Sequence, residues 1–317
     1  MRLSAPRALP LLSALSLLLL CAPRAAAQVP NLCAGQPCIQ IGTYNIEWFG
    51  TSDTSKHAHR SQTTVKQIAA FIADTLDLEI VVLEEINPNS TEYQRLEAAL
   101  QQRGYRLHHG STGGDQSVVI AYDADEVTLL GDVRELDVRN NFDLPGGCHS
   151  GGLRKPLAGH FRAGQFDFVL VGVHLKSQLG GPCADDVRRE QAQDLRGQIE
   201  PLLAAEQERD IIITGDFNAN LNDPSLTPLL QPAAGLRALT AAGRRANSSG
   251  RISYLKAPFQ EIIDQMFVRP DATAEWINRS TFIYNPPTNQ TALNNYLTFF
   301  SDHAPVWASF RTSADDD

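Results

Sequence analysis

The chain has 317 residues, of which 27 are basic and 36 acidic, so its net charge is −9. This length fits one large α/β domain or two small ones. The acidic balance argues against a protein that grips nucleic acid through a broad basic face, because such binding depends on neutralising phosphates. It does not exclude a phosphodiester substrate, since bound cations can supply positive charge locally.

Residues 1–27 have the layout of a secretory signal peptide: Arg2 and Arg7 near the start, an apolar run from Leu11 to Cys21, and three alanines before Gln28. The apolar run is shorter than the roughly 20 residues that a membrane span requires. We therefore expect cleavage after residue 27 and a secreted, extracellular protein, with the periplasm as the alternative. The remainder, residues 28–317, shows no linker or repeat and is predicted to form a single domain of net charge −12, with 24 basic and 36 acidic residues.

Four cysteines remain after that cleavage: Cys33, Cys38, Cys148 and Cys183. An even number in an exported protein favours disulfides over free thiols. Of the three possible pairings we favour Cys33 with Cys38, which closes a tight loop, and Cys148 with Cys183, which joins two glycine-rich segments. A zinc site is the competing interpretation, but these spacings contain no close Cys-x-x-Cys pair.

The first half of the mature chain alternates between strand and helix patterns. In chain order, apolar spacing predicts a strand at 39–44, a helix at 61–76, a strand at 80–83, a helix at 92–101, and strands at 105–108, 117–122 and 126–136. Two of these strands end in groups that can bind a metal. Asn45 follows the first strand, and Glu84 and Glu85 follow the second.

The second half repeats this arrangement of polar residues at strand ends. The predicted elements are strands at 157–161 and 166–173, a helix at 185–202, a buried strand at 211–213, a strand at 262–268 with an acid in its middle, and a closing strand at 304–310. Many neighbouring strands have no helix between them. Two mixed sheets packed face to face with helices outside therefore fit better than one doubly wound sheet.

The polar strand ends form one candidate set. Its members are Asn45, Glu85, His174, Asp216, Asn218, Asp264, Asp302 and His303. An oxygen-rich set of this kind suits Mg²⁺, Mn²⁺ or Ca²⁺ better than zinc. Phosphoryl transfer needs a polarising cation, a base that holds a water in line, and donors to the phosphate oxygens, and the set contains each part.

Six short motifs in this order resemble the endonuclease/exonuclease/phosphatase superfamily, which includes pancreatic-type deoxyribonuclease, exonuclease III-type repair nucleases, neutral sphingomyelinases and inositol polyphosphate phosphatases. The motifs are Tyr44-Asn45, Leu83-Glu84-Glu85, Val173-His174, Gly215-Asp216-Phe217-Asn218, Ile263-Asp264 and Ser301-Asp302-His303. The resemblance spans nearly the whole mature chain. It implies an α/β fold in which four layers, α/β/β/α, form a deoxyribonuclease-like sandwich with the site at one edge of the two sheets.

The resemblance also implies roles for the metal and the water. Glu85 would be the main metal ligand, supported by Asn45, and Asp302 would belong to the metal shell. Asp216 would orient or deprotonate the attacking water. The choice of Glu85 over Glu84 rests on motif alignment, and since neighbours on a strand face opposite ways, only one of them should face the site.

The remaining roles concern the phosphate. Asn218 would hold a phosphate oxygen, and His303 would stabilise or protonate the phosphoryl group while Asp264 fixes its ring. His174 would be the general acid for the leaving oxygen, since histidine is the natural proton donor near neutral pH. Arg154 resembles a family arginine near the phosphate, with a solvated loop charge as the alternative.

One position departs from the pancreatic-type pattern. Gln116, beside Asp115, stands where those enzymes have a glutamate that supports the first histidine. An amide can orient His174 but cannot stabilise its charged form as a carboxylate would. The strength of His174 as an acid is therefore in question.

The resemblance defines the reaction, hydrolysis of a phosphate ester with Mg²⁺, Mn²⁺ or Ca²⁺, more firmly than the substrate. The segment His174-Leu175-Lys176-Ser177 is similar to that of bacterial extracellular nucleases. We therefore expect a monomeric secreted nuclease whose partner is nucleic acid, in particular DNA. The alternatives are a sphingomyelinase or phospholipase C-like enzyme, for which residues 297–300 are the only candidate apolar hairpin or loop, and a non-catalytic binding protein on the same fold.

Overall fold

A computed structural model describes residues 33, 35–243, 252–270 and 273–315 of the protein. One six-stranded sheet, here called sheet A, contains the first strands of the chain. Its spatial order is Phe282–Ile283 (β14), Val306–Arg311 (β15), Cys38–Phe49 (β1), Ile80–Ile86 (β2), Ser117–Asp123 (β4) and Tyr105–His109 (β3). β1 and β2 are parallel, and the other neighbours are antiparallel. The predicted signal peptide, residues 1–27, lies outside the described residues.

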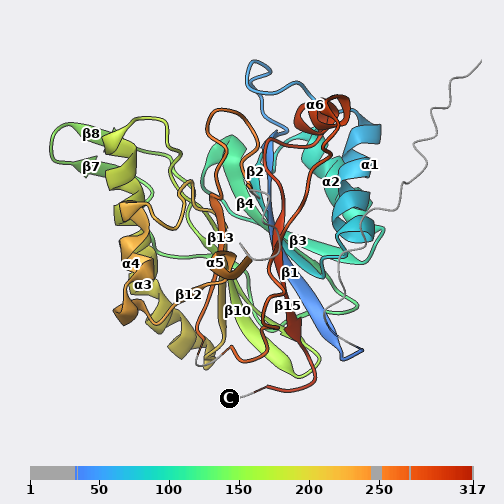
Figure 1. Ribbon diagram of the computed structural model, residues 1–317, viewed down its shortest axis with the longest axis vertical. Coiled ribbons are helices and arrows are strands. Elements are labelled where there is room, and N and C mark those ends of the chain that lie inside the picture. Colours follow the sequence, from blue (N-terminus) through green and yellow to red (C-terminus); the bar gives the residue numbers. More distant parts are fainter. Residues whose placement is uncertain (1–32, 34, 244–251, 271–272, 316–317) are drawn as a thin grey trace, which may run out of the picture. The chain divides into compact units, whose positions relative to one another are not determined.

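The second sheet, sheet B, faces sheet A (Figure 1). Its order is Arg237–Ala238 (β12), Asp264–Val268 (β13), Ile211–Asp216 (β11), Phe166–His174 (β10), Leu157–Ala163 (β9) and Thr128–Leu129 (β5), with Arg134–Glu135 (β6) also paired to β9. β10 and β11 are parallel and the remaining pairs antiparallel. Both sheets are thus mixed, as the missing helices between strands predict.

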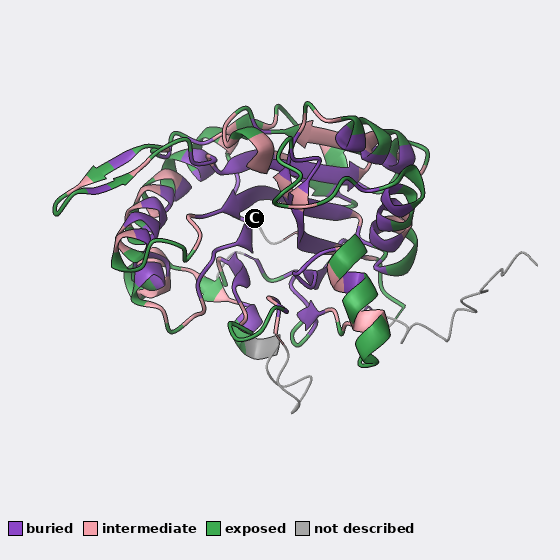
Figure 2. Cartoon of the chain, turned by 90° about the horizontal axis from the view of Figure 1, so that it is seen from above, coloured by how far each residue is buried: buried purple, intermediate pink, exposed green. Residues whose placement is uncertain are grey.

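Helices cover the outer faces of the two sheets (Figure 1). The α-helices of the described residues are Gln62–Ala70 (α1), Thr91–Gln101 (α2), Pro182–Glu206 (α3), Thr227–Leu230 (α4), Thr240–Gly243 (α5) and Gln290–Phe299 (α6). α1 and α2 lie beside sheet A, and α3 and α4 beside sheet B. In Figure 2 the sheets are buried while the helices expose their outer faces, which gives the four-layer α/β/β/α arrangement.

The alternation of side chains along β10 explains how one strand builds both the core and the edge of the sheets. Phe168 and Leu170 face the apolar core between the sheets, whereas Val169 and Val171 pack on the α3 side. His174 continues the first series, so the same period of two carries it to the end of the inter-sheet space. Buried strands thus deliver polar groups to one edge.

Both predicted disulfides are present, Cys33 with Cys38 and Cys148 with Cys183. The second joins the start of α3 to a small hairpin formed by Phe142–Leu144 (β7) and Cys148–Ser150 (β8), which pairs as a separate two-stranded sheet. The predicted pairing is confirmed, and the zinc interpretation of these cysteines is wrong.

Three predicted elements differ from the structure. The strand expected at 126–136 is two short strands, β5 and β6, because Gly131-Asp132 interrupts it. β13 begins at Asp264 rather than carrying it in the middle, since the Ser253 hydroxyl accepts the Asp264 N–H at 3.1 Å. Residues 297–300, considered as an apolar hairpin or loop, are instead the end of α6 and the residue after it.

Candidate active site

Asp216 is the centre of the polar edge because the strand register brings three strand ends together. In sheet B, Asp216 lies opposite His174 of β10 on one side and Asp264 of β13 on the other. Asn45 Nδ2 donates to Asp216 Oδ2 at 3.1 Å, and the Asn218 N–H donates to Oδ1 at 2.7 Å. Burial raises the pKa of Asp216 to about 7, although His303 opposes the shift. The carboxylate is therefore poised to take up a proton near neutral pH.

Glu84 and Glu85 both lie on the side of sheet A that faces sheet B, which corrects the expectation that only one would face the site. The φ angle of Glu85 is 60°, and β2 loses its regular register there, so the strict alternation ends. Glu85 Oε1 accepts from Asn45 Nδ2 at 3.2 Å, and Oε2 accepts the Trp48 N–H at 2.9 Å. Left-handed backbone in a residue with a side chain costs free energy, and such strain gathers at functional sites.

The Glu84 carboxyl lies deeper and plays a different part. It is fully buried, and the Thr43 hydroxyl donates to it. Burial raises the pKa of Glu84 well above its usual value, and the charges of Asp264 and Asp216 raise it further. Glu84 is therefore a neutral acid beneath the site, whereas Glu85 is the carboxylate that lies beside Asn45.

Asp264 and His303 form a buried pair. His303 Nδ1 lies 2.9 Å from Asp264 Oδ2, and its Nε2 lies 3.9 Å from Asp216 Oδ2. Burial alone would lower the pKa of His303, but Asp264 and Asp216 together hold it well above its usual value. The backbone N–H of His303 donates to Ser301 Oγ at 2.9 Å, and that hydroxyl donates to the Asn45 carbonyl at 2.7 Å. The imidazolium thus has a fixed ring and one nitrogen facing the site.

His174 lies on the other side of Asp216, with its Nε2 3.6 Å from Asp216 Oδ2 and 3.8 Å from Glu85 Oε1. Its Nδ1 is buried without a hydrogen bond, so Gln116 does not orient the ring as we had considered. Burial lowers the pKa of His174 well below its usual value, and Arg154 and His303 add to the effect. The ring is neutral, and an approaching phosphate would have to raise its pKa before it could act as an acid.

Arg154 and Asn218 are joined through the Leu175 carbonyl. Arg154 Nη2 donates to that oxygen at 2.7 Å and Asn218 Nδ2 at 3.2 Å. Arg154 is not a solvated loop charge, because it is buried, and its Nε is without a hydrogen bond. Burial lowers the pKa of Arg154 to about 10 against the attraction of Glu85 and Asp216, so the guanidinium stays charged beside the carboxylates.

The ion-pair contacts of Asp302 are with Lys256 and His303, whereas Glu85 contacts Asn45. Asp302 Oδ2 is 2.9 Å from Lys256 Nζ, and Oδ1 is 3.9 Å from His303 Nε2. Lys256 also contacts the Glu47 carboxylate, so the ammonium group joins two acids. Asp302 lies at the site, in agreement with the sequence motif Ser301-Asp302-His303. The sequence motifs did not predict that it pairs with a lysine.

The donor set fits a hard divalent cation. One ligand atom each from Glu85, His174 and Asp216 lie within 4.8 Å of one another, and Asn45 contacts two of these three residues. Two of these three ligand atoms are carboxylate oxygens, which Mg²⁺, Mn²⁺ and Ca²⁺ prefer. Glu85 and Asn45 would hold such an ion.

Sequence reasoning missed Lys256, Glu47 and Tyr254. The ring of Tyr254 meets that of His303 edge to face, with centroids 5.2 Å apart. These residues follow no motif and come from loops or irregular strand ends, so only their positions in space connect them with the site.

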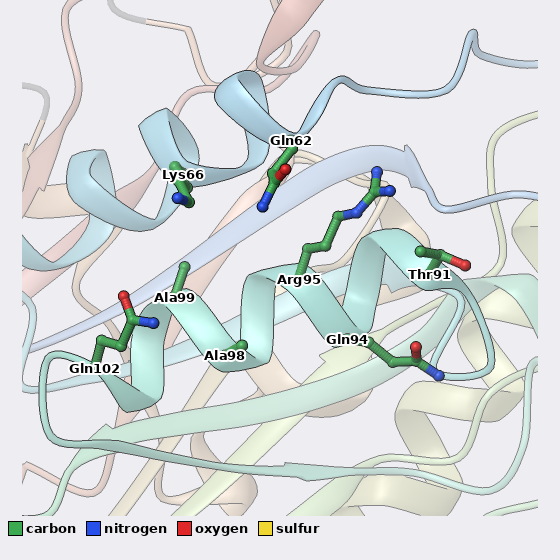
Figure 3. Close-up of a pocket in the computed structure, with 8 residues that line it drawn as sticks. All are labelled: Gln62, Lys66, Thr91, Gln94, Arg95, Ala98, Ala99 and Gln102. Carbon is green, nitrogen blue, oxygen red and sulfur yellow. The ribbon is translucent and has the colours of Figure 1, made fainter.

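A separate groove lies between α1 and α2 and has a volume of about 240 Å³ (Figure 3). Lys66 and Arg95 lie along it, together with glutamine, alanine and threonine side chains. None of its lining residues is an acid or a histidine, so the groove offers no general base or metal ligand.

Within the described part of the chain, no helix combines the length and apolar character needed to cross a membrane.

Comparison with known proteins supports the assignment of the fold. A model described as the Endonuclease/Exonuclease/phosphatase family matches residues 42–303. No curated protein sequence matches the chain. Solved structures with the same fold include the human Nocturnin catalytic domain with bound sulfate (13% identity, TM-score 0.60, covering 87% of this chain and 94% of that one), truncated Caenorhabditis elegans TDP2 (14%, 0.62, 86% and 98%) and an endonuclease/exonuclease/phosphatase from Bacteroides vulgatus (18%, 0.61, 87% and 99%). These likenesses show the predicted two-sheet fold.

Proposed function

This chain belongs to the endonuclease/exonuclease/phosphatase family, and on that premise we propose that it is a secreted, divalent-metal-dependent nuclease that cleaves DNA. The activities in the family's name all hydrolyse phosphate esters, so the general reaction follows from membership. One observation carries the proposal: the Nε2 atoms of His174 and His303 lie 3.6 and 3.9 Å from the same oxygen of Asp216. A proton acceptor is thus flanked by two imidazoles that differ in charge.

In the proposed mechanism, Asp216 accepts the proton of the attacking water. Its other hydrogen bonds, from Asn45 and Asn218, hold the carboxylate in one orientation. His303, kept cationic by Asp264, donates to a non-bridging phosphate oxygen and stabilises the charge that develops there. Asn218 and Arg154 bind the phosphate from the side of the Leu175 carbonyl.

His174 completes the proposed cycle by giving a proton to the leaving oxygen. Its ring is neutral in the surroundings described here, so the negative charge of a bound phosphate must first raise its pKa until the ring takes up a proton from solvent, and this is the proton that it then donates. When bound at Glu85 and Asn45, Mg²⁺ (or Mn²⁺ or Ca²⁺) would polarise the phosphate and lower the pKa of water.

Three features support DNA as the substrate over a lipid headgroup. The segment from His174 to Ser177 is similar to that of bacterial extracellular nucleases, and two disulfides suit an extracellular enzyme. The segment considered for lipid contact, residues 297–300, is the end of α6 and the residue after it rather than a hairpin. We propose that the enzyme acts as a monomer after cleavage following residue 27.

The test is hydrolysis by the purified protein with Mg²⁺ or Mn²⁺, using plasmid DNA, bis(p-nitrophenyl) phosphate and sphingomyelin in parallel. We expect nicking of the plasmid that stops on chelation. Asp216→Asn should lower kcat by about 10²–10⁴-fold with little change in Tm, because it removes the general base but keeps the shape. The matched control is Asp137→Asn, since the Asp137 side chain is 96% exposed.

Full activity of Asp216→Asn would contradict the mechanism. Release of phosphocholine from sphingomyelin without nicking of the plasmid would show that the enzyme is a sphingomyelinase or phospholipase C-like enzyme and not a nuclease. Failure to hydrolyse any of the three would favour a non-catalytic binding protein. The compartment is checked separately by the intact mass of the exported protein, which should start at Gln28.

A further inference from the structure

Lys256 lies between two acids at the site. Its Nζ is 2.9 Å from Asp302 Oδ2 and also contacts Glu47 Oε1. The two acid side chains are only 9% and 10% exposed, whereas Lys256 is 44% exposed. Two largely buried carboxylates therefore share one cation that reaches them from the solvent side.

The backbone holds all three residues in this arrangement. The Leu255 N–H donates to the Asp302 carbonyl at 2.8 Å, which fixes the loop that carries Lys256 beside Asp302. Glu47 has a φ angle of 36°, and its N–H donates to Asn45 Oδ1 at 2.9 Å. The Glu47 carboxylate thus comes from the same part of β1 as Asn45, a residue that we assign to the metal.

Charge explains why the lysine matters. Two neighbouring carboxylates shielded from water repel one another unless a cation lies between them, and a divalent ion or an ammonium group can meet that need. Oxygen donors such as these would suit a second Mg²⁺ or Mn²⁺ if no lysine were there. The ammonium group already contacts both acids.

We propose that Lys256 is a resident cation which occupies Glu47 and Asp302 and excludes a second divalent ion, so that the site takes one ion at Glu85 and Asn45. This inference rests on the metal dependence in the proposed function. Asp302 then binds the Lys256 ammonium group instead of a metal ion, and Lys256 limits the number of divalent ions that the site binds.

The experiment counts bound Mn²⁺ in the full-length folded chain by electron paramagnetic resonance and equilibrium dialysis, without substrate. We expect one ion per chain in the unaltered protein. Lys256→Met removes the charge while keeping an unbranched side chain, and it should bind a second ion. Adding Asp302→Asn to Lys256→Met should return the count to one, because the second ion loses a carboxylate.

The matched control is Lys155→Met, which removes an ammonium group 3.5 Å from the exposed acid Asp137 and should leave the count at one. Near-ultraviolet circular dichroism establishes that each variant is folded. Two ions in the unaltered protein, or an unchanged count in Lys256→Met, would overturn the inference alone. No bound ion in the unaltered protein would instead remove the metal premise of the proposed function.

Discussion

Asp216 shows how much of the chemistry depends on the surroundings of single residues. Its carboxylate lies among His174, His303 and Asn45, and each comes from a different segment of the chain. Burial raises its pKa to about 7, whereas the equally buried His174 has a lowered pKa. The shift moves Asp216 toward a pKa suited to proton transfer near neutral pH, whereas His174 must first gain a proton when a phosphate binds.

Ser301 joins the two sides of the site through one buried hydroxyl. Ser301→Ala would leave the Asn45 carbonyl and the His303 N–H without this partner, which should cost about 1–3 kcal/mol of unfolding free energy. We also expect a lower kcat, because His303 would lose its anchor. Urea unfolding and steady-state kinetics measure the two effects. The exposed Ser55→Ala should change the unfolding free energy by less than about 0.5 kcal/mol, and equal losses in both variants would refute this role.

His160 offers a pH test away from the site. Its Nε2 lies 3.3 Å from Glu208 Oε2 and its Nδ1 3.6 Å from Glu206 Oε2. The contact with Glu208 raises the pKa of His160. A histidine whose pKa is raised on folding contributes to the unfolding free energy. This contribution is complete at pH values below the unfolded pKa of about 6.5, and it is lost as pH rises through the folded pKa.

The unfolding free energy of the unaltered protein should therefore fall, relative to His160→Gln, as pH rises above about 6.5. Urea unfolding at several pH values between 6 and 9 measures this difference. Glu208→Gln should reduce it as well, because the amide no longer attracts the imidazolium. Parallel pH profiles for the unaltered protein and His160→Gln would show that the contact is not formed.

At the scale of elements, the β7–β8 hairpin is held to α3 by a disulfide and a small apolar cluster. Cys148, Phe142 and Leu153 pack against Val187 of α3. Arg154 follows Leu153 directly, so this hairpin and helix also fix the segment that carries a predicted phosphate ligand. The glycine-rich sequence around residue 147 predicts a turn but does not reveal what it packs against.

Replacing both Cys148 and Cys183 by alanine should lower the unfolding free energy by about 4 kcal/mol, because the bond closes a loop of 35 residues in the unfolded chain. Cys33 and Cys38 are only 5 residues apart, so the same replacement there should cost about 2 kcal/mol. Urea unfolding without reductant compares the two. A larger loss from the short loop would contradict the loop-entropy explanation.

At the scale of the whole molecule, the two sheets pack closely at Gly172, which has no side chain. A Cβ atom on Gly172 of sheet B would lie 2.7 Å from Val82 Cγ1 and 3.1 Å from Val118 Cγ1 of sheet A. The sequence shows a glycine within an apolar strand, but the reason for it lies in the opposite sheet. The distance between the sheets in turn sets how near Glu85 can come to Asp216.

Gly172→Ala should therefore lower the unfolding free energy by about 1–3 kcal/mol through overpacking. Gly197→Ala is the matched control, because Gly197 is exposed within α3 and a Cβ there meets nothing within 4 Å. That change should raise the unfolding free energy by up to about 1 kcal/mol, since alanine favours the helix. Opposite signs in thermal or urea unfolding support the close packing of the sheets, and a neutral Gly172→Ala would contradict it.

The sequence by itself predicted the order of most elements, the two-sheet arrangement and the residues that gather at the edge, and it favoured one of the three possible cysteine pairings. These features depend on local patterns, such as the period of two along β10, the amide within β1 and the polar groups that end β10 and β11. It did not reveal α6, because Tyr296 is the only residue of that helix that is buried, so no apolar stripe marks it.

Only the tertiary structure decided how the gathered residues differ from one another. Glu84 becomes a neutral buried acid while Glu85 contacts Asn45, Gln116 leaves His174 without support, and Lys256 pairs with Asp302. Burial and contacts between distant segments set charge states and backbone strain, and neighbours in sequence do not encode them. The sequence therefore identifies the residues at this edge, and the fold determines their charge states.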